Sequence, residues 1–181
     1  MSDKDVTEVV PAEAEGIARA ASILESGGLV AVPTETVYGL AARADDAAAV
    51  ARIYAAKGRP GFNPLIVHCR DAEQAARYGD FSDPVLRDIA QALWPGPLTI
   101  VAERRADAGL AEAVTAGLPT VALRVPAHPV MRELLAAVDF PLAAPSANRS
   151  GFISPTCARH VLASLDGRID MVLDAGPPAA G

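Results

Sequence analysis

The chain has 181 residues, of which 51% are hydrophobic and 21% are charged. This composition excludes a disordered protein and fits one globular domain with a sizeable core. The formal net charge is −6, from 16 Lys and Arg against 22 Asp and Glu, which excludes a protein that holds nucleic acid mainly by bulk positive charge. A local basic cleft is still compatible with this balance.

The cysteines and the N-terminus indicate a cytoplasmic protein. Cys69 and Cys157 are the only cysteines and lack CxxC spacing, so they indicate neither a disulfide framework nor a zinc site. The N-terminus is polar and has no apolar signal core. No apolar run approaches the roughly 20 residues that span a bilayer. We therefore expect a cytoplasmic protein with a flexible end over residues 1–10 and one domain over 11–181.

The first predicted elements are a helix and a buried strand. Apolar residues recur at helical spacing within 11–26, and Gly27 and Gly28 provide the stop. The short apolar run 29–32 is bounded by Gly and Pro and predicts a buried strand. The polar segment 33–40 follows it. Because ligands bind at the carboxyl ends of strands in open α/β sheets, this segment is a candidate site; a Thr-rich turn that caps a helix is the alternative.

Two cations and an amide follow the next helix. Asp45 or Asp46 is a plausible N-cap for a helix that ends near Lys57. A Gly/Pro-rich loop then leads to a strand over 65–67, with His68 at its end. Lys57 has two interpretations of equal weight, because a basic residue at a helix C-terminus either serves a functional loop or stabilises the helix dipole.

The second half of the chain alternates helices and strands. The patterns predict helices over 71–78, 84–93 and 129–138, a helix capped by residues 154–156 that ends near 165, and strands over 98–102, 119–125, 141–144 and 170–173. Residues 103–118 are charged and are expected to be exposed and partly helical. Arg124 ends an apolar strand and needs an anionic partner, with a protein carboxylate as the default and a ligand as the alternative.

The familiar catalytic motifs are missing from the sequence. Walker A, GxGxxG, HExxH and GxSxG patterns do not occur. Polar clusters rich in Lys, Arg, Ser and Asn remain at the predicted strand ends. Such clusters suit phosphate chemistry, in which positioning and charge neutralisation provide most of the rate enhancement.

Several of these clusters, in this order, resemble the motifs of the YrdC family, the threonylcarbamoyl-AMP synthases. The matching segments are PTETVYGL (33–40), KGRP (57–60), NPL (63–65) with His68, WPGPLT (94–99), RVP (124–126) and PSAN (145–148) with SG (150–151). The resemblance extends from about residue 17 to 174. It implies an α/β (α+β) fold with a twisted, mixed parallel and antiparallel sheet and flanking helices around a large concave cavity.

The resemblance also implies a reaction and its partners. L-Threonine, bicarbonate or CO2, and ATP would give threonylcarbamoyl-AMP and pyrophosphate, with Mg2+ accompanying the nucleotide. A threonylcarbamoyl transferase would then use the product to modify adenosine in tRNA, and a weak RNA contact is compatible with this role.

The family's functional positions are transferred one residue at a time. Lys57 and Arg59 are expected to be catalytic, because they can neutralise triphosphate charge. The ATP-contacting positions are Arg59, Asn63, Thr120, Ser146, Asn148 and Ser154. The threonine-contacting positions are Thr36, His68, Arg124 and the backbone of Ala144. No protein-built metal site is expected.

Two alternative functions stay open, and the sequence departs from the family pattern at one place. The alternatives are a YrdC-like enzyme that forms a carbamoyl-adenylate, and a non-catalytic RNA-binding module. In the family, a segment with Ser and Thr follows the last strand and helps to close the site, whereas this sequence stops at residues 175–181. Either the sequence is part of a longer two-domain synthase, or the ATP side of the site is incomplete.

Overall fold

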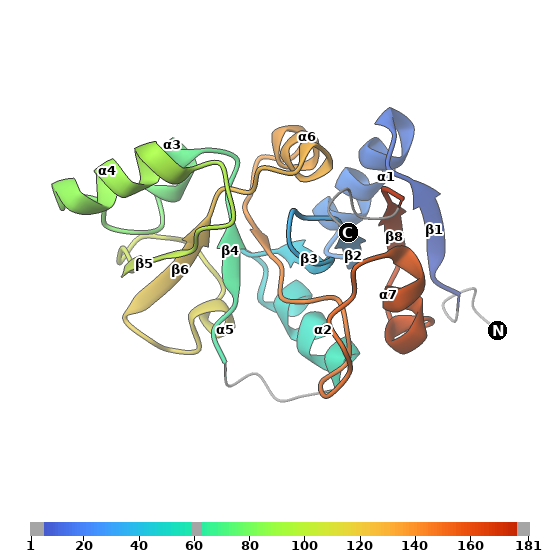
Figure 1. The fold of residues 1–181 in the computed structure, drawn as a ribbon. Helices are drawn as coiled ribbons and strands as arrows, with labels where there is room; N and C mark the ends of the chain where they lie inside the picture. The colour runs from blue at the N-terminus through green and yellow to red at the C-terminus, as the bar shows by residue number, and fades with distance from the viewer. Residues whose placement is uncertain (1–5, 59–62, 177–181) are drawn as a thin grey trace.

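Short strands alternate with helices along the chain in the computed structural model, which describes residues 6–58 and 63–176 (Figure 1). The strands are β1 (Glu8–Pro11), β2 (Val30–Val32), β3 (Gly39–Arg43), β4 (Ile66–His68), β5 (Ile100–Glu103), β6 (Thr120–Arg124), β7 (Leu142–Ala143) and β8 (Met171–Asp174). The helices are α1 (Ala14–Glu25), α2 (Ala47–Lys57), α3 (Ala72–Ala75), α4 (Pro84–Leu93), α5 (Glu112–Thr115), α6 (Pro129–Ala137) and α7 (Ala158–Leu165).

The strands form one mixed sheet in the order β1-β8-β2-β3-β7-β4-β6-β5. Three neighbouring pairs are parallel, namely β1 with β8, β2 with β8, and β4 with β6. The pairs β2–β3, β3–β7, β4–β7 and β5–β6 are antiparallel. The predicted mixed sheet with flanking helices is therefore confirmed, whereas the concave cavity stays a prediction.

Each face of the sheet carries its own apolar core. Val30, Val32 and Met171 belong to the core that includes α1 and α6. Ala31 and Val172, which alternate with them along the same strands, belong to the core that includes α2, α5 and α7. Because successive side chains of a strand point to opposite faces, strands covered on both sides consist of uninterrupted apolar residues. Figure 1 shows α1 and α6 together above the central strands and α2 below them.

The predicted helix starts are largely confirmed. Asp46 accepts hydrogen bonds from the first backbone N–H groups of α2, and Asp83 does the same for α4, with Pro84 as the first helical residue. Gly58 ends α2 in the left-handed conformation, with φ of 68°. This turn directs the chain out of α2 toward the segment that carries Arg59, which lies outside the described residues.

Four expectations are corrected by the structure. Residues 8–10 are not a frayed end but part of β1, and residues 39–43 form β3, which begins within the polar segment 33–40 and was not predicted. The helix expected over 71–78 is the single turn α3. Cys157, and not residues 154–156, occupies the N-cap of α7, and its side chain makes no cap hydrogen bond. For β1 and β3, pairing with strands far away in the sequence outweighs the local signal.

No helix within residues 6–58 and 63–176 is long and apolar enough to cross a membrane. The cysteines lie apart in the chain and are both free, with Cys69 buried and Cys157 partly exposed.

Candidate functional site

Two of the predicted threonine contacts are neighbours at the carboxyl end of parallel strands. His68 of β4 is the register partner of Arg124 of β6. Both side chains are buried, with exposed fractions of 2% and 6%. The parallel pairing therefore brings together two polar residues that are 56 positions apart in the sequence.

Arg124 has a protein carboxylate as its partner, as the default interpretation expected. One Nη atom of Arg124 donates to the carboxylate of Glu35 in an ion pair, and Nε donates to the carbonyl of Gly96 at 3.2 Å. The other carboxylate oxygen of Glu35 accepts the backbone N–H of Ala127 at 2.6 Å. These bonds fix the guanidinium at the strand end.

The imidazole of His68 has an unused polar atom. Its Nδ1 is buried and makes no hydrogen bond within the described part of the chain. Burial, and secondarily the positive charge of Arg124, lower the pKa of His68 from 6.5 to about 4. The imidazole is therefore neutral at neutral pH. A buried polar atom without a hydrogen-bond partner costs free energy. Nδ1 is therefore a candidate to form a hydrogen bond with a ligand.

The threonine-rich motif forms a compact turn beside Glu35. The Oγ1 atom of Thr34 lies 3.0 Å from that of Thr36 and donates to the carbonyl of Val37 at 2.6 Å. It also accepts the backbone N–H of Thr36 at 3.2 Å. This turn leaves Thr36 exposed, in a position to contact a ligand.

The end of β7 lies against the same motif. Gly39 forms an isolated bridge with Ser146, and the backbone N–H of Leu40 donates to the carbonyl of Pro145 at 2.6 Å. A Cβ atom on Gly39 would lie 3.3 Å from the Cβ of Ala144, so the close approach of these two segments favours glycine. Ala144 is thereby held between the motif at 33–40 and the loop that follows β7.

Lys57 connects the end of α2 to that loop. Its buried Nζ donates to the carbonyls of Ser146 at 2.5 Å and Asn148 at 2.7 Å. The backbone N–H of Ser150 donates to the Lys57 carbonyl at 3.1 Å. Lys57 thus anchors a second predicted site segment to the end of α2, and its functional role stays a prediction.

Asn148 organises its own loop. Its Nδ2 donates to the carbonyls of Arg149 at 2.8 Å and Phe152 at 3.0 Å. Its Oδ1 is buried and has no hydrogen-bond partner among the described residues. The side chain therefore shapes the loop, and one acceptor atom is left for a further group.

Of the remaining ATP-side residues, Asn63 and Thr120 lie at the other end of the same strands, whereas Ser154 lies near the motif at 33–40. Asn63 precedes β4 and accepts a hydrogen bond from Tyr54 on its carbonyl at 2.7 Å. Thr120 begins β6, about 13 Å from Arg124 at 3.3 Å per residue. Ser154 is exposed and next to Pro155, whose carbonyl accepts the backbone N–H of Tyr38 at 2.9 Å. The catalytic and ATP-contacting assignment of Arg59 lies outside the described residues.

The site therefore has two halves. One half is formed by His68, Arg124 and the threonine turn, and the other by the starts of β4 and β6, with the loop after β7 in contact with the motif at 33–40. The antiparallel pairing of β7 with β4 carries the chain from the first half to the second. Glu35 is a further member of the site, although the sequence presents it only as part of its motif. Its partner is 89 positions away, so local pattern could not identify the ion pair.

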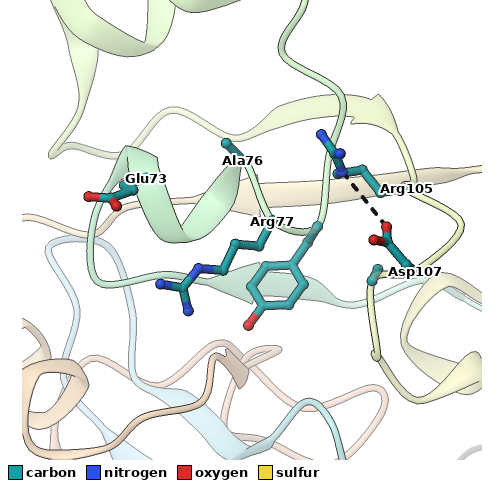
Figure 2. Close-up of a pocket in the computed structure, with 7 residues that line it drawn as sticks. Glu73, Ala76, Arg77, Arg105 and Asp107 are labelled. Carbon is teal, nitrogen blue, oxygen red and sulfur yellow. Dashed lines mark ion pairs between the residues drawn. The ribbon is translucent and has the colours of Figure 1, made fainter.

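A separate hollow lies beside α3, away from these residues (Figure 2). Its lining includes Arg77 and Arg105 together with Glu73 and Asp107. Nε of Arg105 lies 3.8 Å from Oδ1 of Asp107 in an ion pair. Two cations balanced by two carboxylates do not make a basic cleft, so this hollow gives no support to RNA binding by charge. Among the described residues no group of three His, Cys, Asp or Glu side chains could hold a metal ion.

The sequence and the fold are similar to those of known proteins. The Sua5/YciO/YrdC family profile, described as telomere recombination, matches residues 22–181. Threonylcarbamoyl-AMP synthase of Bacillus subtilis is 46% identical over 177 residues, which are 98% of this chain and 51% of that protein. The chain thus spans about half the length of this relative.

Solved structures agree with the sequence comparison. Sua5 of Pyrococcus abyssi, complexed with L-threonine, superposes with a TM-score of 0.88 and 42% identity, over 97% of this chain and 51% of that one. Full-length HypF, in a phosphate- and nucleotide-bound form, gives a TM-score of 0.80 at 24% identity, over 91% of this chain and 25% of that one. The HypF likeness supports the fold alone.

Proposed function

This chain belongs to the Sua5/YciO/YrdC family, and from that premise we propose that it is a nucleotidyltransferase that forms L-threonylcarbamoyladenylate and pyrophosphate. Its substrates would be L-threonine, bicarbonate or CO2, and ATP. The observation that carries the proposal is the pairing of His68 with Arg124 next to the threonine turn. The synthase name of the Bacillus subtilis relative and the threonine complex of Pyrococcus abyssi Sua5 support it.

We assign the threonine side to His68, Arg124, Thr36 and Ala144. The Arg124 guanidinium would bind the substrate carboxylate, because its planar donors match carboxylate oxygens. The unpaired Nδ1 of His68 and the exposed hydroxyl of Thr36 would contact the polar groups of threonine, and the Ala144 backbone would line the same subsite. An apolar amino acid would leave Nδ1 of His68 without a partner, which disfavours its binding.

The ATP side would use the second half of the site. The proposed contacts are Arg59, Asn63, Thr120, Ser146, Asn148 and Ser154. Lys57 and Arg59 would be the catalytic cations. Since the Lys57 ammonium binds the carbonyls of Ser146 and Asn148, we propose that it orders this loop as well as adding positive charge near the triphosphate.

The proposed chemistry needs alignment more than a strong base. The threonine ammonium would lose a proton to solvent, and the free amine would add to CO2 and release a second proton to give an N-carboxylate. An oxygen of this N-carboxylate would then attack the α-phosphorus, forming a P–O bond while the bond to pyrophosphate breaks. The cations would stabilise the charge on the phosphoryl oxygens. Mg2+ would be held mainly by the triphosphate, since such ions are commonly bound by substrate phosphates with few protein ligands.

The product would supply a threonylcarbamoyl transferase that modifies adenosine in tRNA. This downstream partner, a weak RNA contact and a cytoplasmic location stay predictions.

Pyrophosphate release tests the proposed function. We expect release from ATP only when both L-threonine and bicarbonate are present, and little release with valine. Equal release without threonine, or release that requires carbamoyl phosphate, would favour the carbamoyl-adenylate alternative. Binding of RNA with steep salt dependence, but no binding of ATP or threonine, would favour the RNA-binding module.

A Lys57→Met variant tests the ATP side of the same proposal. We expect it to lose pyrophosphate release and to keep threonine binding, because the ammonium lies in the other half of the site. Arg52→Met is the matched control, since Arg52 also lies on α2 and donates to a carbonyl, that of Gly27 at 2.7 Å. Near-normal activity of the Lys57 variant would remove Lys57 from the mechanism.

A further inference from the structure

Glu35 is held at the candidate threonine site by both of its carboxylate oxygens. One oxygen pairs with Arg124, and the other accepts the N–H of Ala127 at 2.6 Å. The Glu35 side chain is 22% exposed and that of Arg124 is 8% exposed. A fixed carboxylate therefore lies at the rim of the subsite, with part of its surface still accessible.

The ion pair leaves Arg124 able to bind a second carboxylate. A guanidinium has five N–H donors. Gly96 takes the donor on Nε and Glu35 takes one on Nη, and within the described part of the chain the other three have no hydrogen-bond partner. A substrate carboxylate could thus bind without displacing Glu35.

The charges at the subsite favour a zwitterion. Arg124 and Glu35 are formally neutral together, and the neighbouring imidazole of His68 is uncharged at neutral pH. The attraction of Arg124 for a simple carboxylate is partly cancelled by the repulsion from Glu35. An α-amino acid avoids this loss, because its ammonium is adjacent to its carboxylate and can face Glu35. Limited exposure strengthens both interactions relative to water.

From these contacts we propose that Glu35 is a specificity residue that binds the α-ammonium of the incoming amino acid, so that the Glu35–Arg124 pair selects zwitterions over simple carboxylates. The inference rests on the proposed threonine site and assigns a ligand group to a residue that the motif comparison left without a role. The substrate class would be free α-amino acids with an unmodified amine.

Calorimetric titration with two matched ligands tests this proposal. L-Threonine and (R)-3-hydroxybutyrate share the carboxylate, hydroxyl and methyl groups and differ in the α-amine. For Glu35→Gln we expect the Kd of threonine to rise about tenfold and that of (R)-3-hydroxybutyrate to fall about threefold. If Glu35 had a purely structural role, the substitution would lower the affinity for both ligands together. That result would overturn the proposal.

Control measurements separate the possible failures. Asp45→Asn breaks a comparable ion pair with Arg43, at 2.7 Å, and should leave both affinities unchanged. Glu35→Asp keeps the charge and should retain the preference for threonine. If Glu35→Gln does not fold, the affinities of the wild-type protein for the two ligands still test the inference. Equal affinities would contradict it. Failure of the wild-type protein to bind threonine contradicts the proposed function instead.

Discussion

At the scale of single residues, buried polar side chains define the candidate site. Lys57, His68 and Arg124 are all nearly inaccessible, which is unusual for such residue types. Each was singled out from the sequence by its position at an element end. Their partners could not be predicted, because the bonds of Lys57 and Arg124 reach segments about 90 positions away.

The protonation of His68 gives a pH prediction at this scale. The folded pKa is about 4 and the ordinary value is 6.5, so between these pH values the unfolded chain binds a proton that the folded chain does not. Stability therefore falls as the pH drops from 6.5 toward 4, by at most roughly 3 kcal/mol from this residue. Urea unfolding at pH 7 and pH 4.5 measures the loss.

His68→Asn should remove this contribution. The variant is expected to lose less stability between pH 7 and pH 4.5 than the wild-type protein. An identical pH dependence in both proteins would contradict the assignment of the buried neutral imidazole.

At the scale of elements, the ends of helices and strands decide where the site residues lie. Strands that had strong apolar runs, such as β2, β4 and β8, were predicted within one or two residues. The strands β1 and β3 were missed. Residues 8–11 follow a polar tail and include a proline, and 39–43 include a glycine, so their strand conformation depends on pairing with β8, β2 and β7.

Gly58 provides a prediction at the element scale. Its φ of 68° is unfavourable for any residue with a Cβ atom. Gly58→Ala should cost about 1 kcal/mol of stability and lower ATP affinity, because Gly58 directs the chain from Lys57 into the segment with Arg59. Chemical denaturation and ATP titration measure the two effects.

Gly117→Ala is the matched control for this variant. Gly117 has φ of 74° with open space around it, and it is exposed. We expect a similar loss of stability with unchanged ATP affinity. If both variants lost ATP affinity equally, the effect of Gly58 would not be local.

At the scale of the whole molecule, the sheet joins the two ends of the described chain. β1 is the edge strand and pairs in parallel with β8, the last strand. Thr7 strengthens this junction, since its buried hydroxyl donates to the Ile169 carbonyl at 2.9 Å and accepts the N–H of Gly167 at 2.9 Å. The first and last strands are thus part of one structure, on the side of the sheet away from β4 and β6.

Thr7→Val tests this junction. The substitution keeps the shape of the side chain but leaves a buried carbonyl and an N–H without partners, so we expect a loss of about 2 kcal/mol in the free energy of unfolding. Threonine binding below the unfolding transition should be unchanged. Ser26→Ala, which removes an exposed hydroxyl bond to Ser22 at 3.1 Å, should have little effect; a comparable loss there would contradict the role assigned to burial.

The sequence by itself determined the alternation of helices and strands, the α/β class, the family and the list of site candidates. These properties follow from local signals, namely apolar periodicity, helix caps and ordered motifs. Only the tertiary structure decided that His68 is next to Arg124, that the carboxylate of Glu35 pairs with Arg124, and that Lys57 binds carbonyls of the loop after β7. Such contacts depend on strand register and order, which a one-dimensional pattern does not encode.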